Sequence, residues 1–252
     1  MSPSGNDRRE CSSGNALLKP CRSKSSRPAQ YCAPTLLTLA SLLAWTFHTA
    51  LDNALTAHCR ETYKSAAAVL QHLSDVDATI KEVLSSGAAT LERIEVHGPK
   101  SEIEQLKTAV ALRGCIMYNA EWGFNATTPP SDANNLVSIH PYFTMKDPAA
   151  FKAAWSGAYA ATFGSQQEEK THAYAFCFDD LTNTAFCRES YLDAAGLLVH
   201  LGNVQAALAA GAAVSEHLRL EVHGPKEELE KLKEKLEPLG AKFFYTEWGF
   251  KN

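Results

Sequence analysis

The sequence is poor in the short motifs that identify cofactor-dependent enzymes. It contains no phosphate-binding glycine loop, no dinucleotide fingerprint, no nucleophile elbow and no HExxH pair. Its 7 cysteines are an odd number and form no CxxC pair, so neither a disulfide framework nor a structural zinc site is predicted. Its histidines show no short metal-binding spacing. We therefore expect no cofactor and no metal ion, and the nucleotide, flavin and hydrolase classes have no local support.

The body of the chain also lacks an excess of positive charge. The net charge of the whole chain is -4, but residues 1–30 carry six basic side chains against two acidic ones, so the remainder has 18 basic and 26 acidic residues. No run of lysine or arginine offsets this balance locally. Because nucleic acid is attracted by a positive field, we predict no nucleic-acid partner.

Residues 1–35 have no apolar periodicity. They are rich in serine, proline and basic residues, which predicts a disordered or targeting tail. The apolar stretch Leu36–Phe47 is shorter than the roughly 20 residues of a membrane span. It fits the core of a secretory signal peptide, and the basic, serine-rich tail fits a plastid or other organelle transit peptide. The alternative is that residues 36–51 form buried helix or strand, which would leave the protein in the cytoplasm.

An internal repeat organises the chain. Residues 93–124, from RIEVHGPK to EWGF, are identical at about half of their positions to residues 219–250. Upstream, residues 58–76 match residues 186–204. The repeat predicts a first unit over 36–125 and a second, complete unit over 137–252. A stretch rich in threonine, proline, aspartate and asparagine over 126–136 is the expected linker.

The second copy shows the patterns of individual strands and helices. Alternating apolar residues bounded by turn residues predict five strands, at 137–144, 172–178, 184–191, 217–223 and 242–250. Helical spacing predicts three helices, at 147–163, after Asp193, and at 227–236. Asp193 is the expected N-cap of the second helix, and Gly240 ends the third. The predicted order is βαββαβαβ.

A βαββαβ core is typical of the ferredoxin-like fold, in which one antiparallel sheet carries helices on one face. Apolar residues alternate onto both faces of the predicted strands, so neither face is expected to be solvated. We therefore predict an α+β fold of two tandem ferredoxin-like units packed sheet to sheet as an intramolecular pseudo-dimer, with further self-association left open. The first copy has no clear equivalent of the first strand and helix of the second. It is either truncated there or uses Leu36–Phe47 in their place.

The segment between the hairpin and the next helix resembles the antibiotic biosynthesis monooxygenase (ABM) superfamily. The shared pattern, ExYxxxAxxxxHL, contains Glu189, Tyr191, Ala195, His200 and Leu201 in the second copy and Glu61, Tyr63, Ala67, His72 and Leu73 in the first. The resemblance covers roughly residues 138–223 well and 55–97 partly. It implies a dimeric α/β barrel, and the activities of the family include cofactor-free oxygenation of quinols and anthrones. The asparagine, tryptophan and histidine set of its haem-degrading members is not evident here.

A cofactor-free oxygenase needs a base, an apolar pocket and groups that hold the substrate anion. We assign the catalytic roles to His200, Glu189 and His140. His200 falls on the sheet-facing stripe of its helix, and an imidazole titrates near neutral pH. The alternative is that His200 is a core histidine bonded to Glu189.

Alternation along the strands also suggests an aromatic substrate pocket. The predicted substrate-binding residues are Tyr142, Tyr174, Phe176, Arg188 and His172. Packing against the partner sheet explains the aromatic members equally well. Arg188 either binds an anionic substrate or pairs with Glu221, and we favour the pairing.

Both copies retain the sequences EVHGP and EWGF. Strand ends that bridge the two units explain this retention, since tryptophan and phenylalanine bury large apolar areas. We predict a structural role for both sequences.

The sequence leads to the hypothesis of a cofactor-independent monooxygenase that acts with dioxygen on a small aromatic or quinol-type molecule. The alternative is a non-catalytic module that binds a small ligand or serves assembly. An open polar cavity around His200 would favour the enzyme. A space filled by Phe176, Phe186 and Leu197 would favour the module.

Overall fold

The computed structural model describes residues 42–51, 56–111, 114–125, 136–164 and 168–251. The predictions for the tail over 1–35, for the start of the apolar stretch over 36–41 and for the linker over 126–135 lie outside the described residues. Those predictions remain expectations.

The described residues form one continuous sheet of nine strands with six α-helices, and the class is α+β. The strands are β1 (Leu42–Ala50), β2 (Ala57–Tyr63), β3 (Glu95–Gly98), β4 (Ile116–Asn125), β5 (Val137–Met145), β6 (Thr171–Asp179), β7 (Thr184–Tyr191), β8 (Ser215–Gly224) and β9 (Ala241–Lys251). The helices are α1 (Ala66–Ser85), α2 (Lys100–Ala111), α3 (Pro148–Gly164), α4 (Ala194–Asn203), α5 (Gln205–Val214) and α6 (Lys226–Leu236). The strand order is β2-β1-β9-β8-β5-β7-β6-β4-β3.

The elements of the second copy follow the predicted order. The β6–β7 hairpin is antiparallel, and the Asp193 carboxylate accepts a hydrogen bond from the Gly196 amide at the start of α4, as an N-cap does. Gly240 takes a left-handed conformation (φ 78°) at the predicted helix end. The single long helix expected after Asp193 is instead two helices, which meet at Val204. Gly202 and Asn203 precede this break, and both are poor helix formers.

No single helix among the described residues is long and apolar enough to cross a membrane. The pair α4 and α5 reaches that length and composition together, but the two helices are bent by 66°.

In the first copy, the hairpin of β1 and β2 takes the place that β6 and β7 have in the second. The described part of the apolar stretch Leu36–Phe47 therefore belongs to β1, and the alternative in which this stretch replaces the first strand and helix is wrong. β2 and β3 each pair with only one other described strand, so both are edges of the sheet. The repeat places the counterpart of β5 between these two edges.

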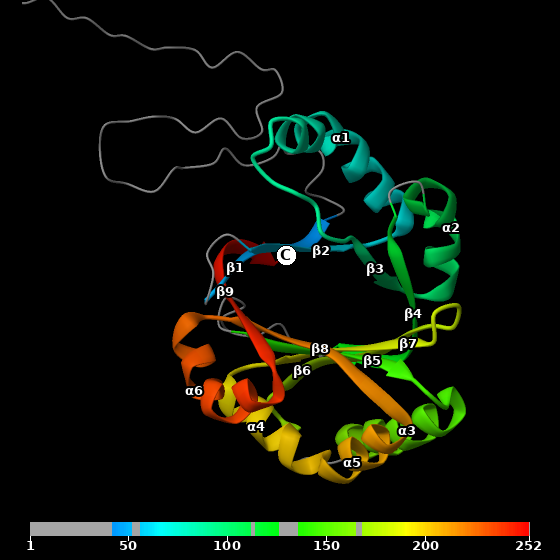
Figure 1. Cartoon of the computed structure of the whole chain (residues 1–252), viewed down its shortest axis with the longest axis vertical. Coiled ribbons are helices and arrows are strands. Elements are labelled where there is room, and N and C mark those ends of the chain that lie inside the picture. The colour runs from blue at the N-terminus through cyan, green and yellow to red at the C-terminus, as the bar shows by residue number, and fades with distance from the viewer. Residues whose placement is uncertain (1–41, 52–55, 112–113, 126–135, 165–167, 252) are drawn as a thin grey trace, which may run out of the picture.

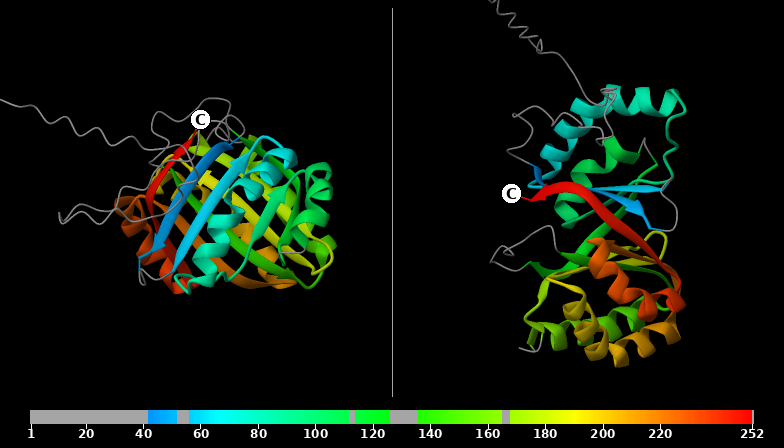
Figure 2. Two further views of the ribbon diagram at one scale, coloured as in Figure 1. Left: turned by 90° about the horizontal axis from the view of Figure 1, so that it is seen from above. Right: turned by 90° about the vertical axis from the view of Figure 1, so that its left-hand side faces the viewer.

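The last strand of each copy bridges the two copies. β4 pairs with β3 of its own copy and with β6 of the second, and β9 pairs with β8 of its own copy and with β1 of the first (Figure 2). The sheet is therefore continuous, whereas the sequence predicted two separate sheets. The predicted bridging role of EWGF is confirmed, because both EWGF sequences lie in these bridging strands.

The sheet curls so that its two halves face each other, with the helices outside (Figure 1). We call the side of the sheet toward the helices the outer face, and the side toward the opposite half the inner face. On the outer face of the second half, strand residues such as Ile139 and Val222 pack with Leu197 and Leu229 in the apolar core. On the inner face, Tyr118, Tyr142, Cys177 and Phe186 form a separate cluster. The prediction that neither face is solvated is confirmed.

Candidate functional site

His200 lies on the outer face, in a buried cluster of charged groups. Its Nδ1 is 2.9 Å from an oxygen of Glu168, and its Nε2 is 3.5 Å from an oxygen of Glu189. Tyr191 donates a hydrogen bond to Glu189 over 2.7 Å. Burial alone would lower the pKa of His200, but the carboxylates of Glu189 and Glu168 outweigh it and raise this pKa. The direction of this shift favours the protonated form of His200, which has no lone pair with which to accept a substrate proton.

The surroundings of His200 are filled with side chains. His200 is 1% exposed, and Phe176, Tyr174 and Leu197 are fully buried near it on the outer face. An open polar cavity around His200 was expected of an enzyme. The space around His200 is instead a packed core. Glu168, which no sequence pattern indicated, completes the cluster from the segment before β6.

The structure does not bring the predicted site residues to one place. His140, Tyr142 and Arg188 belong to the inner face, whereas His200, Glu189, Tyr174 and Phe176 belong to the outer face. His172 is half-buried near the start of β6, beside an irregularity in pairing between Thr171 and Ala173. Because of that irregularity, simple alternation from Tyr174 does not place His172 on a face.

The inner face is crossed by a network of ion pairs between the two halves. Arg93 pairs with Glu95 over 3.2 Å and also with Glu221, and Arg219 pairs with Glu221 over 3.1 Å and also with Glu95. Each arginine thus bridges the two carboxylates, and the four charges balance. These residues occupy equivalent places in RIEVHGP and RLEVHGP. In both copies the arginine and the glutamate are two positions apart. This alternation could have predicted that they lie on the same face of the sheet.

Tyr142 is fixed against this network. Its hydroxyl donates to Glu95 over 2.7 Å, and the guanidinium of Arg219 lies 3.3 Å from the centre of its ring. Burial first, and then the negative charges of Glu95 and Glu221, raise the pKa of Tyr142, so its hydroxyl remains a donor. Tyr142 therefore supplies an aromatic surface of fixed orientation.

Three histidines of the inner face are held neutral. Burial, followed by neighbouring arginines or histidines, lowers the pKa of His97, His140 and His223 well below 6.5. Nδ1 of His140 is buried without a hydrogen-bond partner among the described residues, and His140 stacks on Phe186 with ring centroids 5.5 Å apart. His140 therefore has an uncharged imidazole with an unused nitrogen beside an aromatic surface.

Arg60 and Arg188 are repeat-related arginines of the inner face. Arg60 donates to the hydroxyl of Ser138 over 2.8 Å. Within the part of the chain that the structure describes, neither guanidinium has a carboxylate within ion-pair distance. The predicted pairing of Arg188 with Glu221 is wrong, because Glu221 is taken by Arg93 and Arg219.

The environment disfavours the charge of both guanidiniums. Burial, followed by the charge of Arg188, lowers the pKa of Arg60 to about 10. Burial also lowers the pKa of Arg188. Both side chains remain partly exposed. Two guanidiniums that solvent reaches, and that lack an ion-pair partner among the described residues, are suited to hold an anion.

Among the comparisons with known proteins, only the one with solved structures finds proteins similar to this chain. No protein-family model matches the sequence, and no curated protein matches it. MupZ from Pseudomonas fluorescens is 34% identical over 47% of this chain and 96% of its own, with a TM-score of 0.43. A "putative monooxygenase" from Lactobacillus acidophilus NCFM is 10% identical over 74% of this chain and 77% of its own, with a TM-score of 0.45. An "anthrone oxidase-like protein" is 8% identical over 71% of this chain and 78% of its own, with a TM-score of 0.36. Because each of these TM-scores is below 0.5, the three structures assign neither a family nor an activity to this chain.

Proposed function

We propose that the protein is a cofactor-independent monooxygenase that acts on a small aromatic or quinol-type substrate at the inner face of its sheet. The observation that carries this proposal is the neutral imidazole of His140 beside the two guanidiniums, Arg60 and Arg188, that lack a carboxylate partner. A base that is uncharged at neutral pH and fixed positive charges are what formation of a substrate anion requires. The site thus differs from the one that the sequence suggested around His200.

The proposed reaction begins with proton transfer from the substrate to His140. Arg60 and Arg188 hold the resulting phenolate or enolate, while Tyr142 and Phe186 contact its ring. The anion gives one electron to dioxygen, and the two radicals combine to a peroxide anion, which takes the proton back from His140 and becomes a hydroperoxide. Cleavage of the O–O bond with loss of the remaining C–H proton then leaves a carbonyl and releases water. For an anthrone-type CH₂ group the balance is R₂CH₂ + O₂ → R₂C=O + H₂O.

The proposal includes an ABM-like architecture. Each copy corresponds to one ferredoxin-like unit, over 36–125 and 137–252, and the first lacks the counterpart of β5 and α3 among its described residues. The free edges of β2 and β3 mark the position of that counterpart. We assign this interruption of the barrel as the route to the inner face, since the side chains of Arg93 and His58 nearby are 33% and 30% exposed.

Dioxygen uptake tests the proposed activity. The full chain, treated with a chelator, is supplied with a panel of hydroquinones and anthrones, and uptake above the buffer rate is expected for at least one of them. His140→Ala should lower the rate roughly 100-fold, the effect of a lost general base. His217→Ala is the matched control, because His217 is an exposed histidine on the neighbouring strand β8.

Uptake at the buffer rate across the whole panel, with the protein folded, would contradict the oxygenase for these substrate classes. If the same compounds still bind, the protein is a ligand-binding module. If His140→Ala and His217→Ala behave alike, His140 is not the base.

A further inference from the structure

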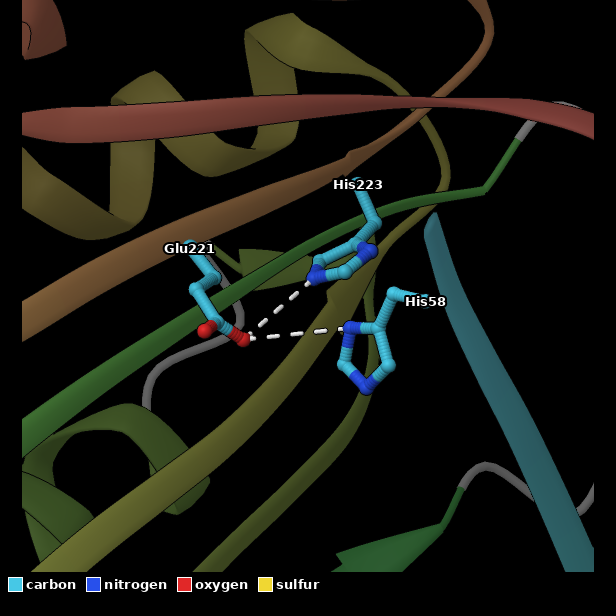
Figure 3. A group of neighbouring side chains, drawn as sticks. All are labelled: His58, Glu221 and His223. Atoms are coloured by element: carbon cyan, nitrogen blue, oxygen red, sulfur yellow. Dashed lines mark ion pairs between the residues drawn. The ribbon is translucent and has the colours of Figure 1, made fainter. Parts of the chain in front are cut away.

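We propose that His58, Glu221 and His223 form a binding site for one Zn²⁺ ion, or a similar divalent ion that prefers imidazole ligands, at the inner face. This site adjoins the one proposed above, since the ring centroids of His140 and His223 are 5.2 Å apart, but the oxygen chemistry proposed there requires no metal. His58 comes from β2 and the other two residues come from β8 (Figure 3). An ion here would join the first copy to the second.

The three ligand atoms already converge. An oxygen of Glu221, Oε2, lies 3.9 Å from Nδ1 of His58 and 3.8 Å from Nε2 of His223, and all three ligand atoms lie within 4.8 Å of one another. Zn²⁺ bonds of about 2.0–2.2 Å place tetrahedral ligand atoms roughly 3.4 Å apart. Closing the remaining gaps, of about 0.4 Å to at most about 1.4 Å, requires only small side-chain rotations.

The hydrogen bonding of these residues indicates that a ligand is missing from their contacts. Oε2 of Glu221 and both ring nitrogens of His223 are buried and have no hydrogen-bond partner among the described residues. The other oxygen of Glu221 is held by Arg93 and Arg219, which leaves Oε2 directed at the two imidazoles. A buried polar atom without a partner is costly, and a metal ion would give both Oε2 of Glu221 and Nε2 of His223 a partner.

The surrounding side chains limit the protein ligands of the proposed ion to three. His48 packs edge-on against His223, with ring centroids 4.8 Å apart, but its own nitrogens lie 2.9 and 3.2 Å from the hydroxyls of Thr46 and Thr246. It therefore orients His223 and does not bind the ion. Two histidines and one carboxylate leave a fourth position for water or an anion. Because Arg60 and the two arginines on Glu221 disfavour a cation, we expect micromolar binding of Zn²⁺ and no competition from Mg²⁺, which prefers oxygen ligands.

The other half of the inner face provides an internal comparison. Glu95 and His97, the counterparts of Glu221 and His223, are likewise 3.9 Å apart. The counterpart of His58 is Phe186, whose ring lies 4.2 Å from that of His97. The first copy's pair therefore has no third ligand. The chain is expected to bind one ion, and not two.

The experiment uses the full chain after chelator treatment, with no substrate present. Isothermal titration with ZnCl₂ is expected to give one equivalent per chain, and Co²⁺ should give the visible absorption of a tetrahedral site. Zn²⁺ should also raise the melting temperature by several degrees, because it binds only the folded chain. His58→Phe reproduces the arrangement of the first copy and should abolish all three signals. His97→Ala, an equivalent histidine outside the site, should keep them.

The proposed metal site is contradicted if the wild-type chain binds no stoichiometric Zn²⁺. It is also contradicted if the His58→Phe variant binds Zn²⁺ as the wild type does. Circular dichroism in chelator establishes that each variant is folded, and His223→Gln replaces His58→Phe if the latter is not. Since no substrate or dioxygen takes part, failure here leaves the oxygenase untouched. Likewise, absence of dioxygen uptake leaves the metal site untouched.

Discussion

Arg188 differs from its repeat counterpart in its hydrogen-bond partners. The counterpart, Arg60, donates to Ser138 on β5. The described part of the first copy contains no counterpart of β5, and within that part Arg188 has no equivalent hydroxyl to bind. A guanidinium with spare donors next to a neutral histidine is suited to hold a substrate anion.

Arg188→Gln should therefore weaken the binding of an anionic aromatic ligand by roughly 10- to 100-fold, the effect of losing a hydrogen bond to a charged group. A neutral ligand of the same size should bind within about twofold of its wild-type affinity, since its ring contacts are unchanged. Fluorescence or calorimetric titration measures both. Equal losses for the two ligands would show that the substitution disturbs the site as a whole.

His200 is predicted to stabilise the folded chain. His200→Gln leaves Glu168 and Glu189 buried without their counter-charge, so the free energy of unfolding should fall by about 3–5 kcal/mol. His72, its counterpart on α1, lies 3.4 Å from Glu61 alone and is less deeply buried. His72→Gln should cost about 1 kcal/mol or less. Urea denaturation compares the two, and equal costs would contradict the paired-carboxylate account of His200.

At the scale of elements, the bridging strands β4 and β9 join the two halves. Gly123 in β4 lies where this strand passes close to β6, and Gly249 in β9 lies where that strand passes close to β1. A Cβ at Gly123 would lie 2.4 Å from the carbonyl oxygen of Tyr174, and one at Gly249 would lie 2.4 Å from that of Trp45. Both contacts are with backbone, which cannot move aside without breaking the pairing.

Gly123→Ala and Gly249→Ala should each lower the free energy of unfolding by about 1–3 kcal/mol, the usual cost of overpacking. Gly157→Ala is the control, because a Cβ there meets nothing within 4 Å on helix α3. It should raise the free energy of unfolding by about 0.5–1 kcal/mol. Chemical denaturation measures all three. No loss of stability in either strand variant would contradict the close approach.

Individual elements were predictable from the sequence because their signals are local. Asp193 and Gly240 mark helix ends by their own chemistry, and the strand of residues 184–191 has the predicted bounds. The faces were not predictable in the same way. Where both faces of a strand are buried, alternation shows that Tyr142 and Phe143 face apart but does not show which one faces the helices.

The site was only partly predictable because it depends on contacts between the copies. The strand positions of His140, Tyr142 and Arg188 predicted them as site residues, and the structure places all three on the inner face. Pairing of Arg93 with Glu221 requires the two halves to face each other, which no spacing rule reports. The constant Arg-x-Glu-x-His pattern was visible in both copies, but its retention alone does not distinguish a bridging strand from a binding site.

At the scale of the whole molecule, two groups of histidines predict a maximum of stability near pH 6.5. Burial and neighbouring charges lower the pKa of His97, His140 and His223, and that of His58 to about 4, so the unfolded chain binds more protons below pH 6.5. Stability should fall as the pH drops from 6.5 toward 4, by up to about 1.4 kcal/mol per pH unit for each histidine.

The loss of stability above pH 6.5 has the opposite cause, a histidine whose pKa is raised. The pKa of His200 is raised, so its contribution is complete below pH 6.5 and is lost as the pH rises through the raised value. Urea denaturation between pH 4.5 and 9 tests both arms. His140→Gln should reduce the acid slope by the equivalent of one proton, and His200→Gln should flatten the alkaline arm. A stability that rises steadily with acid would contradict the neutral state of the inner histidines.

The ionisation of a bound phenol tests most directly whether the inner face holds a substrate as its anion. A nitrophenol that dioxygen does not oxidise is titrated with the full chain, and its visible absorption reports the phenolate. We predict that binding lowers the pKa of the phenol by at least about one unit, and that the Arg60→Gln/Arg188→Gln double variant abolishes this shift. A bound phenol whose pKa is unchanged or raised in the wild-type chain would contradict the account.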